Sequence, residues 1–171
     1  GMERVSSMKI LGVVFEGDLS FRAQVDRLVG QSNQSLFAIK QLRAQGLSGP
    51  SLWDVTRATL VSRLTYASPV WWSVCDEGGK KRLQAVLNRL IKRGFLSQGQ
   101  PTMTELCENA ADKLFAAIVR NPAHVLHPLL PPVRVVDYDM RQRSHNRVIP
   151  LIKNTHFKKT FINNMIYKDC Y

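Results

Sequence analysis

The chain has 171 residues, with 24 Lys or Arg against 13 Asp or Glu, so its formal net charge is +11 at pH 7. This length allows one domain with a hydrophobic core, with or without a tail, and disfavours two full domains. The charge favours a polyanionic partner, nucleic acid or an acidic membrane surface. The alternative is a basic surface that only keeps the protein soluble.

The sequence contains no run of about 18 apolar residues that could cross a membrane, and we expect no signal peptide ahead of Met8. Cys75, Cys107 and Cys170 stand singly, a spacing that indicates neither a disulfide framework nor a zinc site. We therefore expect an intracellular protein, cytoplasmic or nuclear. Cys107 is expected to be a small core residue.

Residues 9–17 predict one short buried strand with Gly12 in its middle and no partner strand after it. Because a single strand cannot satisfy its own backbone hydrogen bonds, we expect the chain to be the tail of a larger protein whose sheet lies upstream. Asp18 and Ser20 follow as a turn and an N-cap. They open a long amphipathic helix, which we expect to end near Gly46.

A second helix is predicted from about Ser51, and its apolar residues on several sides indicate a central position. Pro69 lies late in this helix and predicts a kink or a frayed end, because proline removes an amide donor and crowds the carbonyl four residues before it. Trp71 and Trp72 are expected at that junction.

Gly78 and Gly79 interrupt the helical pattern, and a third helix is predicted from about residue 80 to residue 95. Thr102 and Glu105 have the spacing of a capping box, in which each side chain accepts a hydrogen bond from the backbone amide of the other residue. They open a fourth helix, which we expect to end at residues 121–122.

Residues 121–132 are rich in proline and predict an extended linker. Residues 133–171 are basic, and their pattern leaves open a strand, a short helix or an arm that orders on a partner. The expected domains are a strand remnant at 1–17, a helical bundle at 18–120, this linker and this extension. The expected fold class is mainly α, a helical bundle with one or two short N-terminal strands and an irregular basic C-terminal extension.

The third helix is the candidate nucleic-acid-binding site, because residues 80–93 include basic residues and no acidic one. Helical geometry places Arg82, Arg89 and Arg93 in a row beside the apolar face, with Lys81 and Lys92 opposite the core. Such a row can follow a phosphate backbone without reading its sequence. The alternative is a solvated helix face. The candidates are Lys80, Lys81, Arg82, Arg89, Lys92 and Arg93.

The C-terminal segment mixes cations with aromatic residues, which either stack on single-stranded nucleic acid or, as we expect, dock the segment onto the helices. These residues are Tyr138, His145, His156, Phe157, Phe161 and Tyr167.

His124 and His127 lie among prolines and predict local hydrogen bonds rather than metal binding. Asp137 and Asp139 lack a third carboxylate nearby, so a loop or edge position is expected there, with no metal and no other cofactor. Phosphate-binding and hydrolase motifs are missing from the sequence.

Residues 9–15 read K-I-L-G-V-V-F, residues 18–21 read D-L-S-F and residues 64–71 read L-T-Y-A-S-P-V-W. Together with residues 83–89, these strings resemble the end of the palm and the thumb of reverse transcriptases from non-LTR retrotransposons of the long-interspersed-element type. The resemblance covers most of the chain and weakens after residue 121. It implies that residues 9–16 correspond to the last palm strand, and that the helices correspond to a thumb, which holds the primer and template duplex by its backbone.

The polymerase site of that family needs an Asp-Asp pair and a further Asp to hold two metal ions, and this sequence has no adjacent aspartates. The fingers and most of the palm have no counterpart here, so we expect the chain alone not to polymerise DNA. The expected residual activity is non-sequence-specific binding of RNA or an RNA/DNA duplex, beside the missing palm and fingers of a parent polymerase. Lys40, Arg43 and Arg57 are weaker candidates for that binding.

Two alternatives remain open at this point. One is a helical protein-interaction module that uses the N-terminal strand and the pair Trp71-Trp72. The other is a decayed element without a nucleic-acid role.

Overall fold

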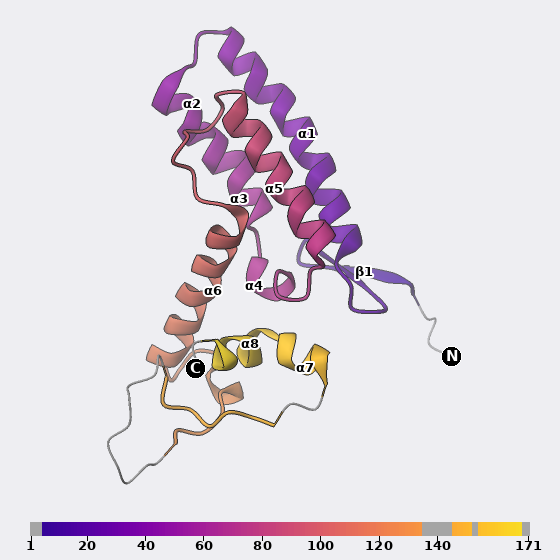
Figure 1. Ribbon diagram of the computed structural model, residues 1–171, viewed down its shortest axis with the longest axis vertical. Helices are drawn as coiled ribbons and strands as arrows, with labels where there is room; N and C mark the ends of the chain where they lie inside the picture. The colour runs from indigo at the N-terminus through magenta and orange to yellow at the C-terminus, as the bar shows by residue number, and fades with distance from the viewer. Residues whose placement is uncertain (1–4, 135–144, 152–153, 169–171) are drawn as a thin grey trace. The chain divides into compact units, whose positions relative to one another are not determined.

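The computed structural model describes residues 5–134, 145–151 and 154–168 (Figure 1). The chain forms two compact units, residues 1–107 and residues 108–171. Its elements are mainly helices, with a pair of short strands near the N-terminus, so the predicted fold class is confirmed. None of the described helices combines the length and the hydropathy that crossing a membrane requires.

The chain starts with a β-hairpin. Strands β1 (Ser7–Ile10) and β2 (Val13–Glu16) pair in antiparallel register, with Ser7 opposite Glu16 and Ile10 opposite Val13. Leu11 and Gly12 form the turn with φ values of 46° and 86°, the two positive values that a tight hairpin turn requires. The prediction of one buried strand with Gly12 in its middle is therefore wrong. Gly12 reverses the chain, and β1 is exposed along its whole length.

Two side chains hold this turn against the helices. Tyr66 donates its hydroxyl to the carbonyl oxygen of Leu11 at 3.0 Å, and the guanidinium of Arg27 donates to the carbonyl oxygen of Gly12. Gln24 completes the attachment, since its Oε1 accepts a hydrogen bond from the amide of Val14 at 3.1 Å. The hairpin is thus tied to the helical bundle by polar contacts, in addition to the buried side chain of Val13 in β2.

Helix α1 (Arg22–Ala44) is the long amphipathic helix predicted after the strand, and it ends before Gly46, which has a φ of 99°. Its predicted N-cap is wrong. Ser20 instead donates its hydroxyl to Glu16 at 2.9 Å, and the same Glu16 oxygen accepts from the amide of Ala23 at 3.1 Å. A carboxylate from β2 therefore satisfies the first turn of α1, a favourable placement for a negative charge.

The second predicted helix is interrupted. Helix α2 (Gly49–Thr56) continues through a π-helical turn, η1 (Arg57–Val61), into the short α3 (Ser62–Leu64). Ala67 then takes a left-handed conformation, and Pro69 lies in the first turn of α4 (Ser68–Trp71). The predicted break near Pro69 is confirmed, although the proline begins a new turn of helix instead of bending the old one.

Helix α5 (Glu77–Lys92) begins earlier than predicted. Asp76 is its N-cap and accepts a hydrogen bond from the amide of Gly79 at 2.6 Å, so Gly78 and Gly79 lie within the first turn and do not interrupt the helix. At Gly79, a Cβ atom would come within 2.8 Å of the Cys75 sulfur. The glycine therefore lets α5 begin against the core, which the sequence pattern alone did not indicate.

Helix α6 (Met103–Arg120) begins with the predicted capping box. Glu105 accepts from the amide of Thr102 at 2.7 Å, and Thr102 accepts from the amide of Glu105 at 3.2 Å. This box is confirmed because both partners lie within one helical turn, where local geometry decides the contact.

The core of the first unit lies between α1, the α2–α4 segment and α5, with α1 and α5 side by side in Figure 1. Trp71, Leu60, Leu64, Leu83 and Leu87 are fully buried there. Cys107, 1% exposed, is the small core residue that was predicted.

The second unit has its own small core, formed by Phe115, Ile118, Leu130, Met165 and Ile166. Besides the end of α6 it contains the 3-10 turn η2 (His127–Leu129), a single bridge between Val133 and Arg147, and the helices α7 (Thr155–Lys159) and α8 (Phe161–Tyr167). The prediction that residues 121–132 form an extended linker is therefore wrong for part of this segment. The chain turns there at η2 and buries Leu130.

Candidate nucleic-acid interface

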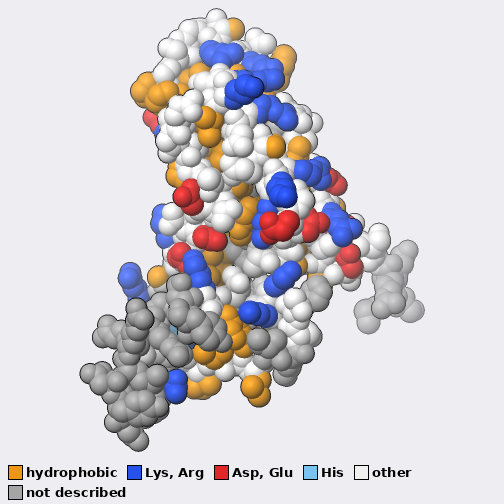
Figure 2. All heavy atoms as spheres, in the orientation of Figure 1, with side chains coloured by type: hydrophobic (Ala, Val, Ile, Leu, Met, Phe, Trp, Pro, Cys, Tyr) orange, Lys and Arg blue, Asp and Glu red, His pale blue; other side chains and the backbone are white. Residues whose placement is uncertain are grey.

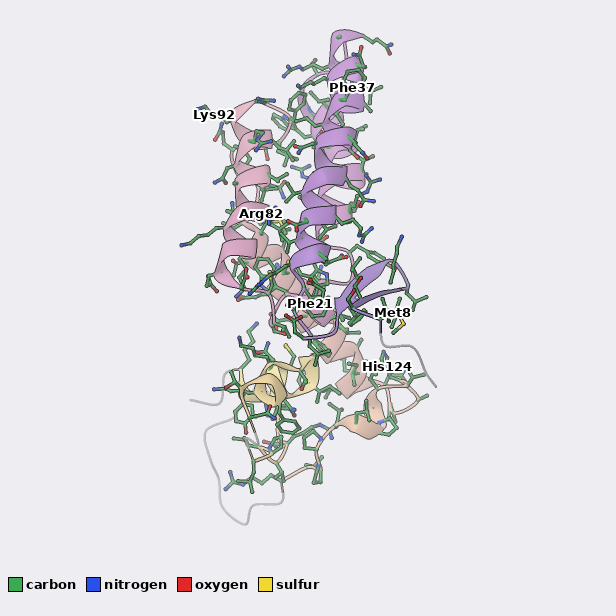
Figure 3. The ribbon with its side chains drawn as sticks, turned by 90° about the vertical axis from the view of Figure 1, so that its right-hand side faces the viewer. Met8, Phe21, Phe37, Arg82, Lys92 and His124 are labelled. Atoms are coloured by element: carbon green, nitrogen blue, oxygen red, sulfur yellow. The ribbon has the colours of Figure 1, made fainter. Side chains whose placement is uncertain are left out.

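Helices α1 and α5 run side by side in the same direction (Figures 1 and 3). Near their beginnings, Arg82 on α5 forms an ion pair with Asp26 on α1, with Nη2 and Oδ1 2.6 Å apart. About two helical turns further along, Arg89 donates to the side-chain oxygen of Asn33 at 3.2 Å. At the ends, Arg43 of α1 donates to the backbone oxygen of Arg93 at 2.9 Å.

The α1 partners follow a seven-residue spacing, which keeps side chains on one side of a helix. Asp26 and Asn33 are followed in this row by Lys40. On α5, Arg82 and Arg89 have the same spacing. The charge between the two helices therefore changes along their length, from an acid beside a base, to an amide beside a base, to bases on both helices.

The sequence places no acid near these helix ends. After Asp26 the next acidic residue is Asp54, and after Glu77 it is Glu105. Figure 2 shows many Lys and Arg side chains at the end of the first unit where α1 and α5 finish, and most acidic side chains nearer the opposite ends of both helices. Asp54 of α2 is an exception, since the adjacent Trp53 bonds Gly94 at the α5 end, but its carboxylate is paired with Arg57. The later halves of α1 and α5 thus carry cations without neighbouring carboxylates in their own sequence.

Two of the predicted site residues are neutralised by ion pairs. Arg82 is paired with Asp26, as described above. Lys80 lies 2.9 Å from the carboxylate of Glu77, and its ammonium also lies 5.6 Å from the ring centroid of Trp72. These two cations are less available to a phosphate than the sequence analysis expected, since they already have partners.

The other four predicted residues, Lys81, Arg89, Lys92 and Arg93, are exposed. Within the part of the chain that the structure describes, none of these four forms an ion pair. Their charges are therefore balanced by solvent ions, which a polyanion can replace.

The three weaker candidates differ from one another. Lys40 is exposed on the row that faces α5. Arg43 stacks 4.2 Å from the centroid of Phe95 besides bonding Arg93, so it holds the two helix ends together. Arg57 pairs with Asp54 at 2.9 Å and donates to Gln100, which makes its role structural.

We call the exposed cations at the ends of the two helices the α1–α5 basic face, formed by Lys40, Arg89, Lys92 and Arg93. Basic residues at helix C-termini also interact favourably with the helix dipole, by about 0.3–1 kcal/mol each. The helix dipole carries only about half an elementary charge at this end, so it compensates the positive charge of these residues only in part. On α5, Arg89 and the pair Lys92 and Arg93 lie one helical turn apart, roughly 5 Å along the axis, and Lys40 lies on the neighbouring α1.

Sequence analysis missed the partner of Arg82 and one exposed aromatic residue. Asp26 carries a detectable signal, since its spacing to Asn33 and Lys40 matches that of Arg82 and Arg89, but only the packing of α1 on α5 makes the match meaningful. Phe37 lies off the apolar stripe of α1 and is 66% exposed (Figure 3).

The aromatic residues of the C-terminal segment dock within the second unit where the structure describes them, as expected. His145 is 7% exposed, and its Nε2–H donates to the backbone oxygen of Ile166 at 2.9 Å. Phe161 packs against the second core, and the hydroxyl of Tyr167 donates to the backbone oxygen of Pro150. Tyr138 and the side chain of His156 lie outside the described residues, as do the carboxylates of residues 137 and 139.

The remaining predictions concern small polar sites and the tryptophan pair. The Nδ1 atom of His124 accepts a hydrogen bond from the amide of Leu126 at 3.1 Å, the local contact that was predicted. Across the described residues, His, Cys, Asp and Glu side chains do not converge in groups of three or more that could hold a metal ion. Trp71 and Trp72 are 0% and 8% exposed, so this pair cannot supply the surface of the proposed protein-interaction module. The strand that the same alternative uses does carry exposed apolar side chains, Met8 and Ile10.

Comparison of the chain with protein-family models, with curated proteins and with solved structures found no match.

Proposed function

We propose that the first unit binds the sugar-phosphate backbone of RNA or of an RNA/DNA duplex, without sequence preference, through the α1–α5 basic face. The observation that carries this proposal is the common end of two parallel helices, where Lys40, Arg89, Lys92 and Arg93 are exposed and no acid lies nearby in either sequence stretch. Cations in such a row displace condensed counterions from a polyanion, which drives binding that is insensitive to base sequence.

The overall charge of +11 supports the same partner class. A polyanion attracted by the whole protein would be oriented by the local field, which is strongest where cations lack acidic neighbours. Along α1 and α5 that condition holds at their ends and fails at the Asp26–Arg82 ion pair.

We also propose that this binding corresponds to the duplex-holding role of a thumb, as in the non-LTR retrotransposon reverse transcriptases that the sequence resembles. In this proposal the chain derives from such an RNA-directed DNA polymerase and has no polymerase activity by itself, because the sequence lacks the adjacent aspartates that would hold catalytic metal ions. The exposed position of the basic face is compatible with a duplex lying across α1 and α5.

The test is fluorescence anisotropy with a labelled RNA/DNA duplex of about 20 base pairs, titrated at salt concentrations from about 50 to 200 mM. The variant Lys40→Glu/Lys92→Glu reverses two charges of the basic face. Its matched control, Lys9→Glu/Lys113→Glu, makes the same change in net charge at exposed positions on β1 and α6.

We expect the wild type to lose affinity steeply as salt rises and Lys40→Glu/Lys92→Glu to weaken binding by about 10-fold or more at low salt, with a shallower salt dependence. Thermal unfolding should be nearly unchanged, since both residues are exposed. Equal losses in the two double variants would show that only net charge matters, and the proposed face would be wrong. A wild type that does not bind the duplex would overturn the proposed function itself.

A further inference from the structure

We propose that Phe37 stacks on an unpaired base, so that the α1–α5 basic face prefers a duplex that carries a single-stranded segment over a blunt duplex. The inference rests on the proposed function, because it assigns a second kind of contact to the same face. The cations alone contact phosphates and do not distinguish paired from unpaired nucleotides, whereas a ring that stacks on a base would do so.

Phe37 is the exception on its helix. The neighbouring apolar residues Leu36 and Ile39 are 7% and 2% exposed and belong to the core, whereas Phe37 is 66% exposed. An aromatic ring that remains largely in water gives up the favourable free energy of burial, about 25 cal/mol for each Å² of apolar surface. A flat partner that covers the ring recovers this free energy.

The surroundings of Phe37 fit a nucleic acid. The residues three and four positions away, which are its neighbours on the helix surface, are Asn33, Gln34, Lys40 and Gln41. They supply amide groups and one ammonium group, and none of them is acidic. Amides and ammonium groups donate hydrogen bonds to phosphate oxygens and base edges, while the ring provides a stacking surface.

The same surroundings do not fit an ordinary protein-binding patch. Among the described residues of α1, the other large exposed apolar side chain is Leu42. It lies five residues further along, about 140° around the helix from Phe37. A protein partner needs a contiguous apolar surface, whereas a single ring suits a partner the size of one base.

The positions of the cations agree with this contact. Figure 3 shows Phe37 on α1 and Lys92 on α5 toward the same end of the paired helices, whereas Arg82 lies toward the other end. Lys40 follows Phe37 by one turn on the adjacent row. A strand whose phosphate contacts Lys40 would therefore have a neighbouring base within reach of the ring, because Lys40 and Phe37 are neighbours on the surface of α1.

The test compares two labelled probes by anisotropy: a blunt RNA/DNA duplex of about 20 base pairs and the same duplex with a single-stranded extension of about eight nucleotides. For the wild type we expect tighter binding to the extended probe. Phe37→Ala should remove this preference, because its affinity for the extended probe should fall about 10-fold while its affinity for the blunt duplex stays nearly unchanged. Val70→Ala, which also truncates an exposed apolar side chain, should change neither affinity.

Substitution by other rings and by an aliphatic residue separates stacking from simple apolar contact. Phe37→Trp should retain the preference, and the fluorescence of the new indole should be quenched by the extended probe and not by the blunt one. The native Trp71 and Trp72 are buried, but Trp53 is half-buried and donates to the backbone oxygen of Gly94 at 3.3 Å, near the end of α5. The wild type titrated with the same two probes therefore gives the background that is subtracted from the Phe37→Trp signal. Phe37→Leu should behave like Phe37→Ala, because leucine cannot stack on a base.

Two results would overturn the inference while leaving the proposed function intact: an unchanged preference in Phe37→Ala, or equal affinity of the wild type for both probes with a normal loss in Lys40→Glu/Lys92→Glu. Concentration-dependent self-association that Phe37→Ala abolishes, without an effect on either probe, would assign the ring to a protein contact and would also overturn the inference. If Lys40→Glu/Lys92→Glu bound both probes as tightly as the wild type does, this result would instead count against the proposed function.

Discussion

Arg82 and Asp26 form an ion pair with Nη2 and Oδ1 2.6 Å apart, at the place where the surface between α1 and α5 changes from balanced to positive. Both side chains are more than half exposed, so the pair contributes only about 0–1 kcal/mol to stability. Its larger effect is electrostatic, because it removes one cation from the row that continues through Arg89 and Arg93.

Asp26→Asn is therefore predicted to strengthen binding to a nucleic acid duplex. Releasing Arg82 adds one cation that can neutralise a phosphate, so the slope of log K against log salt should become steeper by about 0.7–0.9. Anisotropy titrations at several salt concentrations measure this slope directly.

The matched control is Glu77→Gln, which makes the same change in net charge and releases Lys80. Because the Lys80 ammonium lies over the Trp72 ring, its release should change the slope less. Equal effects of both variants would contradict the role given to the α1–α5 basic face.

Two adjacent glycines in the first turn of α5 are predicted to respond in opposite ways to alanine. At Gly78 a Cβ atom meets only the Asp76 carboxylate, at 3.5 Å, so Gly78→Ala should raise the free energy of unfolding by about 0.5–1 kcal/mol through helix propensity. At Gly79 the Cβ would lie 2.8 Å from the Cys75 sulfur and 3.2 Å from Val25. Gly79→Ala should therefore lower stability by about 1–3 kcal/mol. Denaturant unfolding of the two variants tests the pair, and stabilisation by Gly79→Ala would contradict the packing described here.

The capping box of α6 predicts an effect on stability and on its pH dependence. Thr102→Ala should lower the free energy of unfolding by about 1 kcal/mol, because the amide of Glu105 loses its acceptor. Hydrogen bonds from the amide and hydroxyl of Thr102 hold the pKa of Glu105 below its usual value of 4.5. The ionised form is favoured in the folded state, so this stabilisation is present above pH 4.5 and is lost as the pH falls through the native pKa.

Glu105→Gln is the variant that isolates the pH-dependent part. Its deficit relative to the wild type should be largest near neutral pH and should shrink at acidic pH, as measured by urea unfolding at a series of pH values. A deficit that is constant across that range would show that the carboxylate charge has no role in the cap.

Cys75 predicts a loss of stability in alkaline solution. Burial, with a smaller effect of the Asp76 charge, raises the pKa of the Cys75 thiol from 9.0 to about 11. Between these values the unfolded chain releases the thiol proton and the folded chain keeps it, so the free energy of unfolding falls as the pH rises from 9 to 11.

The comparison for this prediction is Cys75→Ala, which removes the titrating group. Tyrosine and lysine side chains ionise in both proteins over the same range, so the difference between their unfolding curves reports on Cys75. Parallel curves for the wild type and Cys75→Ala from pH 9 to pH 11 would refute the prediction.

Local sequence signals were reliable where the interacting residues lie within one or two helical turns. The buried stripe of α1 and the Thr102–Glu105 cap could be predicted because helical geometry alone brings their members together. The start of α5 was placed too late, because Gly78 and Gly79 look like an interruption until the packing against Cys75 is known.

The N-terminal hairpin shows what local signals miss. Leucine rarely takes a positive φ, so nothing in the string around Leu11 and Gly12 marks a tight turn. Contacts from Arg27 and Tyr66, both distant in the sequence, hold the two turn carbonyls in place. Likewise Ser20 was a plausible N-cap by residue type, yet the carboxylate of Glu16 satisfies the first turn of α1.

By itself, the sequence determined that this protein is built mainly of amphipathic helices and carries a large positive charge. It also determined that acid-free stretches include the ends of two of those helices. These properties depend only on residue order and helical periodicity. Only the tertiary structure decided which cations keep an unbalanced charge. Arg82 and Arg89 look alike on the helix, but packing of α1 against α5 sets an aspartate beside the first and an asparagine beside the second. Electrostatic interactions act over a few ångströms of space, and the distance along the chain does not reveal that neighbourhood.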